Sequence, residues 1–215
     1  MTVLLLHAFP LDERMWETQL PALAGHEVRA PRLYGRGPTM DAWAESVAGE
    51  IEGDLVVVGA SMGGYCALAL ARRAPERVRG LLLLGARPDA DSAERRAGRA
   101  DTIALIEAEG PDGLWRMMLP KLVADETKLD QSLQHRDVDQ LVQAMEAVRD
   151  RADSTEVART LAAPVQFVVG DSDPYVSAAE LSGFEVLELA ETGHLANLER
   201  PDEFNTILLD FLRRV

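Results

Sequence analysis

The chain has 215 residues, of which 47% are hydrophobic and 27% charged, a balance typical of one soluble globular domain with a sizeable core. Its formal net charge of −14 at pH 7 argues against nucleic acid and anionic membranes as partners, because phosphate groups require a basic surface. The single cysteine, Cys66, excludes an internal disulfide and a multi-cysteine zinc site, and we expect neither a metal nor a cofactor.

Short apolar runs rich in valine and leucine predict the strands. They lie at 3–6, 27–30, 55–58, 78–84, 165–169 and 185–189. The first run has no basic lead and is too short for a signal peptide, and no window has the length of a membrane span. We therefore expect a cytoplasmic protein.

Helical patterns lie between the predicted strands. Asp12 is expected to cap a first helix and Thr39 a second. The apolar positions are Met15, Trp16, Leu20 and Leu23 in the first, Trp43, Val47 and Ile51 in the second, and Phe204, Ile207, Leu208, Phe211, Leu212 and Val215 in the last. Continuous apolar strands that alternate with helices predict an α/β protein whose parallel sheet is covered on both faces.

The alternation stops between about Arg87 and Leu161, where no convincing strand is found. Helices are predicted there at 102–109, 113–123 and 138–152, the last with a stripe of apolar residues. We expect this stretch to form a separate helical layer.

The most informative motif is Gly-x-Ser-x-Gly at 59–63, which ends a strand and opens a helix. In that context the turn exposes the hydroxyl of Ser61, and the N–H of Met62 lies beside it at a helix N-terminus. Gly59 and Gly63 supply the two positions that must lack a Cβ atom. The motif therefore predicts a serine nucleophile.

A serine nucleophile needs a base and an acid that orients the base. His7 and His194 follow strands, whereas His26 and His135 are expected on the surface. Asp173 follows the strand at 165–169, and the order serine, aspartate, histidine is that of a doubly wound hydrolase. Two other carboxylates stay open as alternatives for the acid: Asp171 and Asp89.

Five segments in this order resemble the α/β-hydrolase family, of the type that includes small carboxylesterases and lactonases. They are the oxyanion loop at 6–12, the loop at 31–37, the nucleophile turn at 59–64, the acid loop at 170–173 and the histidine loop with the final helix at 193–204. Three residues depart from the family pattern: Ala8 stands where glycine is usual, and Arg32 and Tyr34 replace the usual aspartate and arginine.

The resemblance implies a minimal form of that fold. About six strands are expected, without the two N-terminal strands of the family, and a helical cap is expected after the family's sixth strand. The hydrolase core would comprise 1–86 and 162–215, and the cap would comprise 87–161.

The resemblance also implies a carboxylic ester hydrolase with Ser61 as nucleophile, His194 as base and Asp173 as acid, and with the N–H groups of Phe9 and Met62 as oxyanion hole. The substrate is expected to be a small, mostly apolar and neutral ester or lactone, although Arg87 could pair with a carboxylate. The expected substrate-binding residues are His7, Leu11, Trp115, Met118 and Leu119, and His7 could equally shape the oxyanion loop.

Other activities of the same scaffold stay open. They are C–C bond hydrolysis, cofactor-free perhydrolysis and non-catalytic, receptor-like ligand binding. Dehalogenation is disfavoured because it would need a carboxylate where Ser61 stands. The chain is expected to be a monomer or a homodimer.

Overall fold

A computed structural model describes all 215 residues and contains one sheet of six parallel strands. The strand order is β2-β1-β3-β4-β5-β6. The strands are β1 (Thr2–Leu6), β2 (Glu27–Arg29), β3 (Leu55–Ala60), β4 (Val78–Leu84), β5 (Val165–Gly170) and β6 (Glu185–Leu189). The predicted α/β class and all six predicted strands are confirmed.

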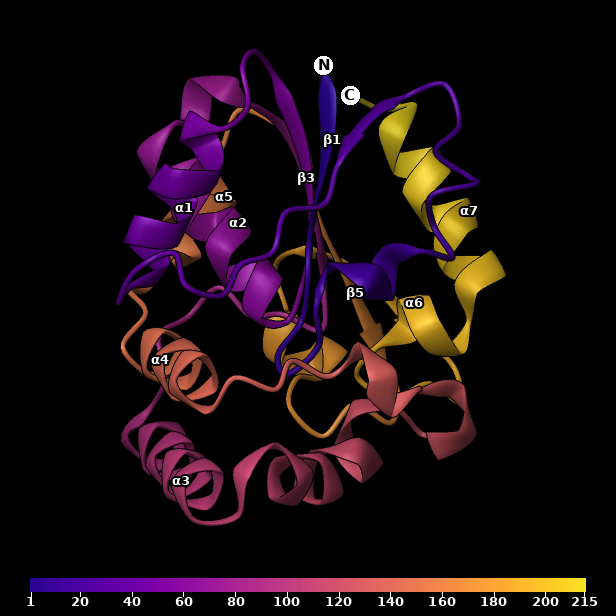
Figure 1. Cartoon of the computed structure of the whole chain (residues 1–215). Helices are drawn as coiled ribbons and strands as arrows, with labels where there is room; N and C mark the ends of the chain where they lie inside the picture. Colours follow the sequence, from indigo (N-terminus) through magenta and orange to yellow (C-terminus); the bar gives the residue numbers. More distant parts are fainter.

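Helices cover both faces of the sheet (Figure 1). On one face lie α1 (Met40–Gly49), α2 (Met62–Arg73) and the short α5 (Thr155–Thr160), and on the other lie α6 (Ala196–Glu199) and α7 (Pro201–Leu212). Thr39 caps α1 as predicted, because its hydroxyl accepts the N–H of Ala42. The strands of the middle of the sheet are therefore buried on both sides.

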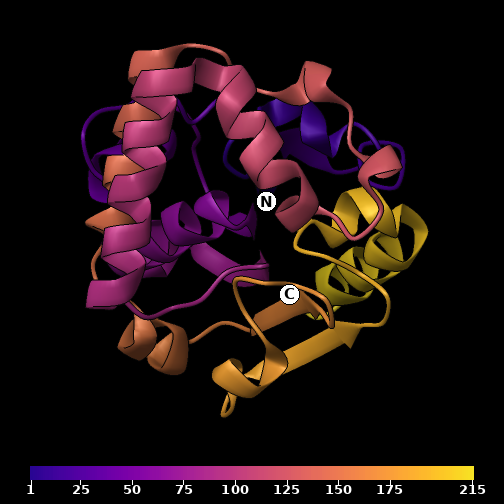
Figure 2. The ribbon, with the colours of Figure 1, turned by 90° about the horizontal axis from the view of Figure 1, so that it is seen from below.

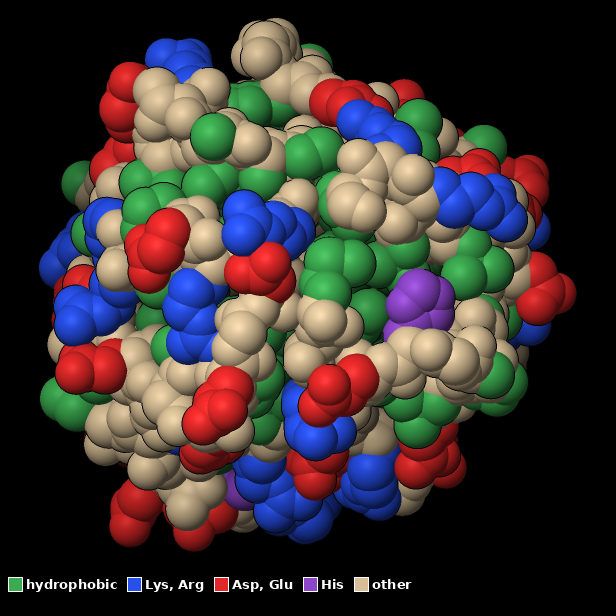
Figure 3. Space-filling view, turned by 90° about the horizontal axis from the view of Figure 1, so that it is seen from above, with side chains coloured by type: hydrophobic (Ala, Val, Ile, Leu, Met, Phe, Trp, Pro, Cys, Tyr) green, Lys and Arg blue, Asp and Glu red, His purple; other side chains and the backbone are tan.

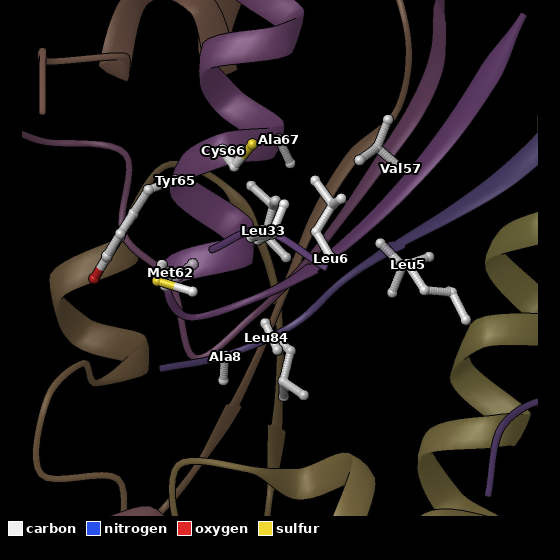
Figure 4. Close-up of a cluster of buried hydrophobic side chains, with 14 of the residues drawn as sticks. Leu5, Leu6, Ala8, Leu33, Val57, Met62, Tyr65, Cys66, Ala67 and Leu84 are labelled. Atoms are coloured by element: carbon white, nitrogen blue, oxygen red, sulfur yellow. The ribbon is translucent and has the colours of Figure 1, made fainter. Parts of the chain in front are cut away.

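The main apolar core lies between α2 and the sheet. Figure 4 shows Cys66 and Ala67 of α2 facing strand residues such as Leu6, whereas Tyr65 extends away from this cluster. Cys66 is fully buried, and this burial raises the pKa of its thiol to about 12. Packing against the sheet thus fixes the helix that begins at Ser61.

Two further helices lie across the carboxyl ends of the strands, α3 (Ala93–Leu122) and α4 (Val138–Arg149). Figure 2 shows the two arms of α3, which meet at a bend. The bend is at Gly110, whose φ of 65° leaves the helical region, and Pro111 opens the second arm. The predicted break between 109 and 113 is confirmed, but the first arm begins earlier than predicted, at a cap formed by Ser92.

The helix predicted after Asp12 is wrong in length. Asp12 does cap a turn, but only the 3₁₀ segment Glu13–Trp16 forms, and Leu20 is exposed. Pro21 supplies the reason, because proline lacks an N–H and disfavours a helical conformation of the residue before it. The helix predicted at 138–152 likewise ends earlier, at Arg149.

No helix of the structure combines the length and the apolarity that a membrane span requires. The end of the molecule opposite α3 and α4 carries acidic and basic side chains intermixed with apolar ones (Figure 3).

Candidate active site

Ser61 lies on the sharp turn between β3 and α2. Its φ of 50° and ψ of −111° are unusual for a residue with a side chain, and the turn is held by a 2.7 Å hydrogen bond from the Ser61 N–H to the carbonyl of Leu84. The backbone is therefore strained at the residue that carries the hydroxyl, as expected for a nucleophile on a strand-to-helix turn.

The flanking glycines make this turn possible. A Cβ atom on Gly59 would lie 2.5 Å from the carbonyl oxygen of Gly63, and one on Gly63 would lie 2.1 Å from that of Leu6. Both distances are far shorter than van der Waals contact, so no side chain fits at either position. The turn is thereby pressed against the end of β1.

His194 and Asp173 come together from the loops after β6 and β5. Nδ1 of His194 lies 2.8 Å from Oδ2 of Asp173, and both side chains are buried. The N–H of Tyr175 donates to the other carboxylate oxygen at 2.8 Å, and the Tyr175 ring meets the imidazole edge-on. At Gly85 a Cβ atom would lie 2.8 Å from Nδ1 of His194, so a side chain there would displace the imidazole.

The two alternative acids lie elsewhere. Asp171 accepts the N–H of Thr192 and the hydroxyl of Ser172, so it braces its own loop. Asp89 pairs with Arg87 and Arg95, each at 2.6 Å. Asp173 is thus the carboxylate in contact with His194.

Phe9, on the loop after β1, lies at the same cavity as Met62. Met62 is the first residue of α2, so its N–H has no partner within the helix. Phe9, Ser61, Met62 and His194 line one cavity. A pair of free N–H groups beside a serine hydroxyl can stabilise an oxyanion.

His7 joins the loop after β1 to the loop after β2 by hydrogen bonds. Its Nε2 accepts the N–H of Leu33 at 2.9 Å, so Nδ1 is the protonated nitrogen and donates to the carbonyl of Ala8 at 3.2 Å. Complete burial lowers the pKa of His7 to about 4, and the ring stays neutral near pH 7. His7 therefore holds the oxyanion loop and does not line the cavity.

His135 was expected on the surface, and this is wrong. Its ring is half-buried and stacks on Tyr34 with 3.9 Å between ring centroids. A single antiparallel β-bridge pairs Gln134 with Leu11, so the segment next to His135 lies against the oxyanion loop. The charged neighbours of His135 in the sequence concealed this contact.

The cavity at Ser61 has two parts. The inner part, between Ser61, His194 and Met118, has a volume of about 20 Å³. It opens toward an outer part of about 280 Å³ between α3 and the loop after β5. The two parts share the side chains of Tyr65, Arg99, Met118, Met145 and Tyr175. No group of three His, Cys, Asp or Glu side chains is arranged to hold a metal ion.

The sequence profile described as the alpha/beta hydrolase family matches residues 3–207. The chain belongs to this family.

Other members resemble the chain over part or nearly all of its length. A pimeloyl-[acyl-carrier protein] methyl ester esterase of Aromatoleum aromaticum is 43% identical over 93 residues, which span 40% of the chain and only 37% of that relative. An enzyme of the same name from Neisseria meningitidis is 25% identical over 99% of the chain and 94% of its own length.

Two solved structures of the family superpose closely. A thermophilic esterase from Thermogutta terrifontis, in a malate-bound form, gives a TM-score of 0.87 at 29% identity, over 99% of the chain and 89% of the esterase. The enol-lactonase from Burkholderia xenovorans gives 0.84 at 25% identity, over 99% of the chain and 91% of the lactonase.

Only one of the substrate-binding residues expected from the sequence, Met118, lines this hydrolase cavity. Leu11, within the oxyanion loop, is fully buried, Trp115 is buried in the core, and Leu119 packs against that core. Helical periodicity places Trp115 and Met118 on one side of α3 but cannot say which of them reaches the cavity. Cavity residues that sequence reasoning missed are Tyr65, Arg99, Met145, Val148 and Tyr175.

Glu199 is a further residue that sequence reasoning did not single out. One carboxylate oxygen accepts the N–H groups of Ala124 and Asp125 at 2.7 and 3.0 Å, and the other accepts that of Gly193 at 2.6 Å. This buried carboxylate thereby joins the end of α3 to the loop that carries His194. Its position in the final motif gave no sign of this role.

Proposed function

We propose that this carboxylic ester hydrolase acts through an acyl-enzyme formed on Ser61. The Ser61 oxygen attacks the ester carbonyl carbon while Nε2 of His194 accepts the hydroxyl proton. Collapse of the tetrahedral intermediate breaks the C–O bond, and His194 returns the proton to the leaving alcohol. Water then attacks the acyl group by the same route and releases the acid.

The observation that carries this proposal is the contact between His194 and Asp173 beside the cavity that Ser61 lines. A carboxylate on Nδ1 keeps the proton there, so Nε2 is free to act as the base. The N–H groups of Phe9 and Met62 would hold the negative charge on the substrate oxygen.

We further propose that residues 87–161 act as a cap over this site. Met118 on α3 and Met145 and Val148 on α4 line the inner cavity, whose small volume suits a short apolar group next to the scissile carbonyl. A small lactone is a second substrate type, supported by the likeness to an enol-lactonase.

Modification of Ser61 tests the mechanism. A fluorophosphonate should label the wild type at Ser61, and Ser61→Ala should lose labelling and about 10⁴-fold or more in kcat for a short-chain ester. Ser182→Ala is the matched control, because Ser182 is an exposed serine outside the cavity. Wild-type turnover by Ser61→Ala would overturn the proposal, and an unchanged unfolding temperature would show that the variant is folded.

A further inference from the structure

The two parts of the cavity differ in what they can hold. The inner part of about 20 Å³ accommodates little more than one water-sized group. The outer part is more than ten times larger, at about 280 Å³. Most of a substrate whose ester lies at Ser61 must therefore occupy the outer part, and the side chains there select the substrate.

The outer cavity is lined by four cationic side chains and by no carboxylate. The cations are Arg87, Arg95, Arg99 and Lys121. This is unusual in a chain with a formal net charge of −14, whose general field repels anions. Positive charge is therefore concentrated at this cavity, although the chain as a whole is negative.

Nearby carboxylates compensate these cations unequally. Arg87 is fully paired, with Asp89 at 2.6 Å and Glu180 at 3.1 Å. Asp91, in contrast, is shared by three guanidinium groups, those of Arg95, Arg99 and Arg151, at 3.2, 3.2 and 2.7 Å. The cluster as a whole has four guanidinium groups, including that of Arg87, and three carboxylates, those of Asp89, Asp91 and Glu180, so one positive charge remains uncompensated in the wall.

Arg99 is the least satisfied of the three. Only its Nε contacts Asp91, and its two terminal nitrogens donate to no group of the protein. Arg95 by comparison also contacts Asp89 and the carbonyl of Ala90. The Arg99 side chain is only 21% exposed, so an ion pair formed there is screened less than one on the surface. A guanidinium with two free terminal nitrogens matches the two oxygens of a carboxylate.

Lys121 supplies a second free cation at the same cavity. Its Nζ lies 3.5 Å from the sulfur of Met117 and has no carboxylate within ion-pair distance. Arg99 lines both parts of the cavity, together with the apolar side chains of Met118 and Met145, whereas Lys121 lines only the outer part. The cationic wall thus extends from the inner cavity at Ser61 into the outer one.

We propose that Arg99, assisted by Lys121, binds a carboxylate at the end of the substrate remote from the scissile ester. The preferred substrates are then carboxylate-bearing esters, such as half-esters of short dicarboxylic acids. The inference rests on the proposed hydrolysis at Ser61 and replaces the neutral esters expected from the sequence. Arg99 lies among charged residues of a helix, where the sequence does not indicate that it faces the cavity.

Matched esters test the proposal. For monomethyl succinate, glutarate and adipate, kcat/KM is compared with that for the corresponding methyl esters in which an amide replaces the free carboxylate. The wild type should prefer a half-ester by about 10- to 100-fold, the range of a hydrogen-bonded charge pair, and added salt should reduce the preference. Arg99→Gln should abolish the preference, and Arg99→Lys should retain part of it.

Arg116→Gln is the matched control, because Arg116 lies on the same helix, is 67% exposed and pairs with Glu109 away from the cavity. Lys121→Gln should weaken the preference for half-esters, and Lys128→Gln is its control, since these two are the only lysines of the chain. Free glutarate should inhibit the wild type competitively and Arg99→Gln at least about tenfold more weakly.

The outcomes separate this inference from the proposed function. Ester hydrolysis that depends on Ser61 but shows no preference for half-esters would overturn the inference alone. A preference of more than tenfold for methyl 4-phosphonobutanoate over monomethyl glutarate would overturn it in favour of a phosphoryl group. Hydrolysis that persists in Ser61→Ala would instead remove the mechanism on which the inference rests.

Discussion

At the scale of single residues, the Asp173 carboxylate has two hydrogen-bond partners, the imidazole of His194 and the N–H of Tyr175. Its side chain is fully buried, and no lysine or arginine lies within ion-pair distance. A buried carboxylate without other counter-charges favours the imidazole that donates from Nδ1. The geometry thus fixes which nitrogen faces Ser61.

Replacement of the acid should remove this control. Asp173→Asn should lower kcat roughly 10⁴-fold with little change in shape, because an amide can donate to Nδ1 and hold the wrong tautomer. Asp171→Asn is the matched control and should cost less than about tenfold, since Asp171 only braces its own loop. Steady-state kinetics on a short-chain ester provide the measurement, and a larger loss in Asp171→Asn would reassign the acid.

The proposed nucleophile, base and acid could be predicted from the sequence because each follows a strand and lies within three residues of a glycine. Arg99 could not, because Arg95, Arg96 and Arg99 form a charged stretch typical of an exposed helix face. Arg96 pairs with Asp150 on the outside, whereas Arg99 turns inward. That choice depends on how α3 is rotated against α4, which is a property of packing and not of the local pattern.

At the scale of elements, the bend of α3 lets its two arms each contribute to the cavity, Arg99 from the first arm and Met118 from the second. Gly110, with a φ of 65° and a ψ of −164°, occupies a region that is almost closed to other residues. The sequence predicted the break through Gly110 and Pro111. It did not predict the first nine residues of the helix, because residues 93–101 carry no apolar stripe.

Alanine substitutions at Gly98, in the first arm of α3, and at Gly110, at the bend, should change the free energy of unfolding in opposite directions. Gly110→Ala should lower the free energy of unfolding by about 1–3 kcal/mol, because it forces a side chain into a strained conformation. Gly98→Ala should raise it by up to about 1 kcal/mol, since Gly98 is helical and a Cβ atom there meets nothing within 4 Å. Urea unfolding measures both changes, and destabilisation of equal size would contradict the role of the bend.

At the scale of the whole molecule, His7 makes stability depend on pH. Its pKa is about 4 in the folded chain and near 6.5 when unfolded, so the unfolded chain binds more protons between these values. Stability should therefore fall as the pH falls from about 6.5 to about 4, by on the order of 3 kcal/mol from this residue.

The comparison of wild type with His7→Gln isolates this contribution. The variant starts from lower stability at pH 7 if the bonds of His7 to Leu33 and Ala8 are lost, but its loss between pH 6.5 and 4 should be smaller. Denaturant unfolding at several pH values gives the slope of unfolding free energy against pH for the wild type and for the variant. Equal slopes would show that His7 is protonated without cost, and His26→Gln, at an exposed position, serves as the control.

Burial of Cys66 has a consequence for observing this molecule. The only thiol of the chain lies between α2 and the sheet, fully covered and with its pKa raised to about 12. Reagents that attack thiolates therefore reach it only when α2 separates from the sheet. Ser61, the proposed nucleophile, directly precedes α2. The rate of thiol modification therefore reports how often α2 separates from the sheet and Ser61 loses its fixed position. A cysteine introduced at an exposed position on α3 would, by the same reasoning, be the one reactive thiol of the folded enzyme and could carry a fluorophore that reports movement of the proposed cap.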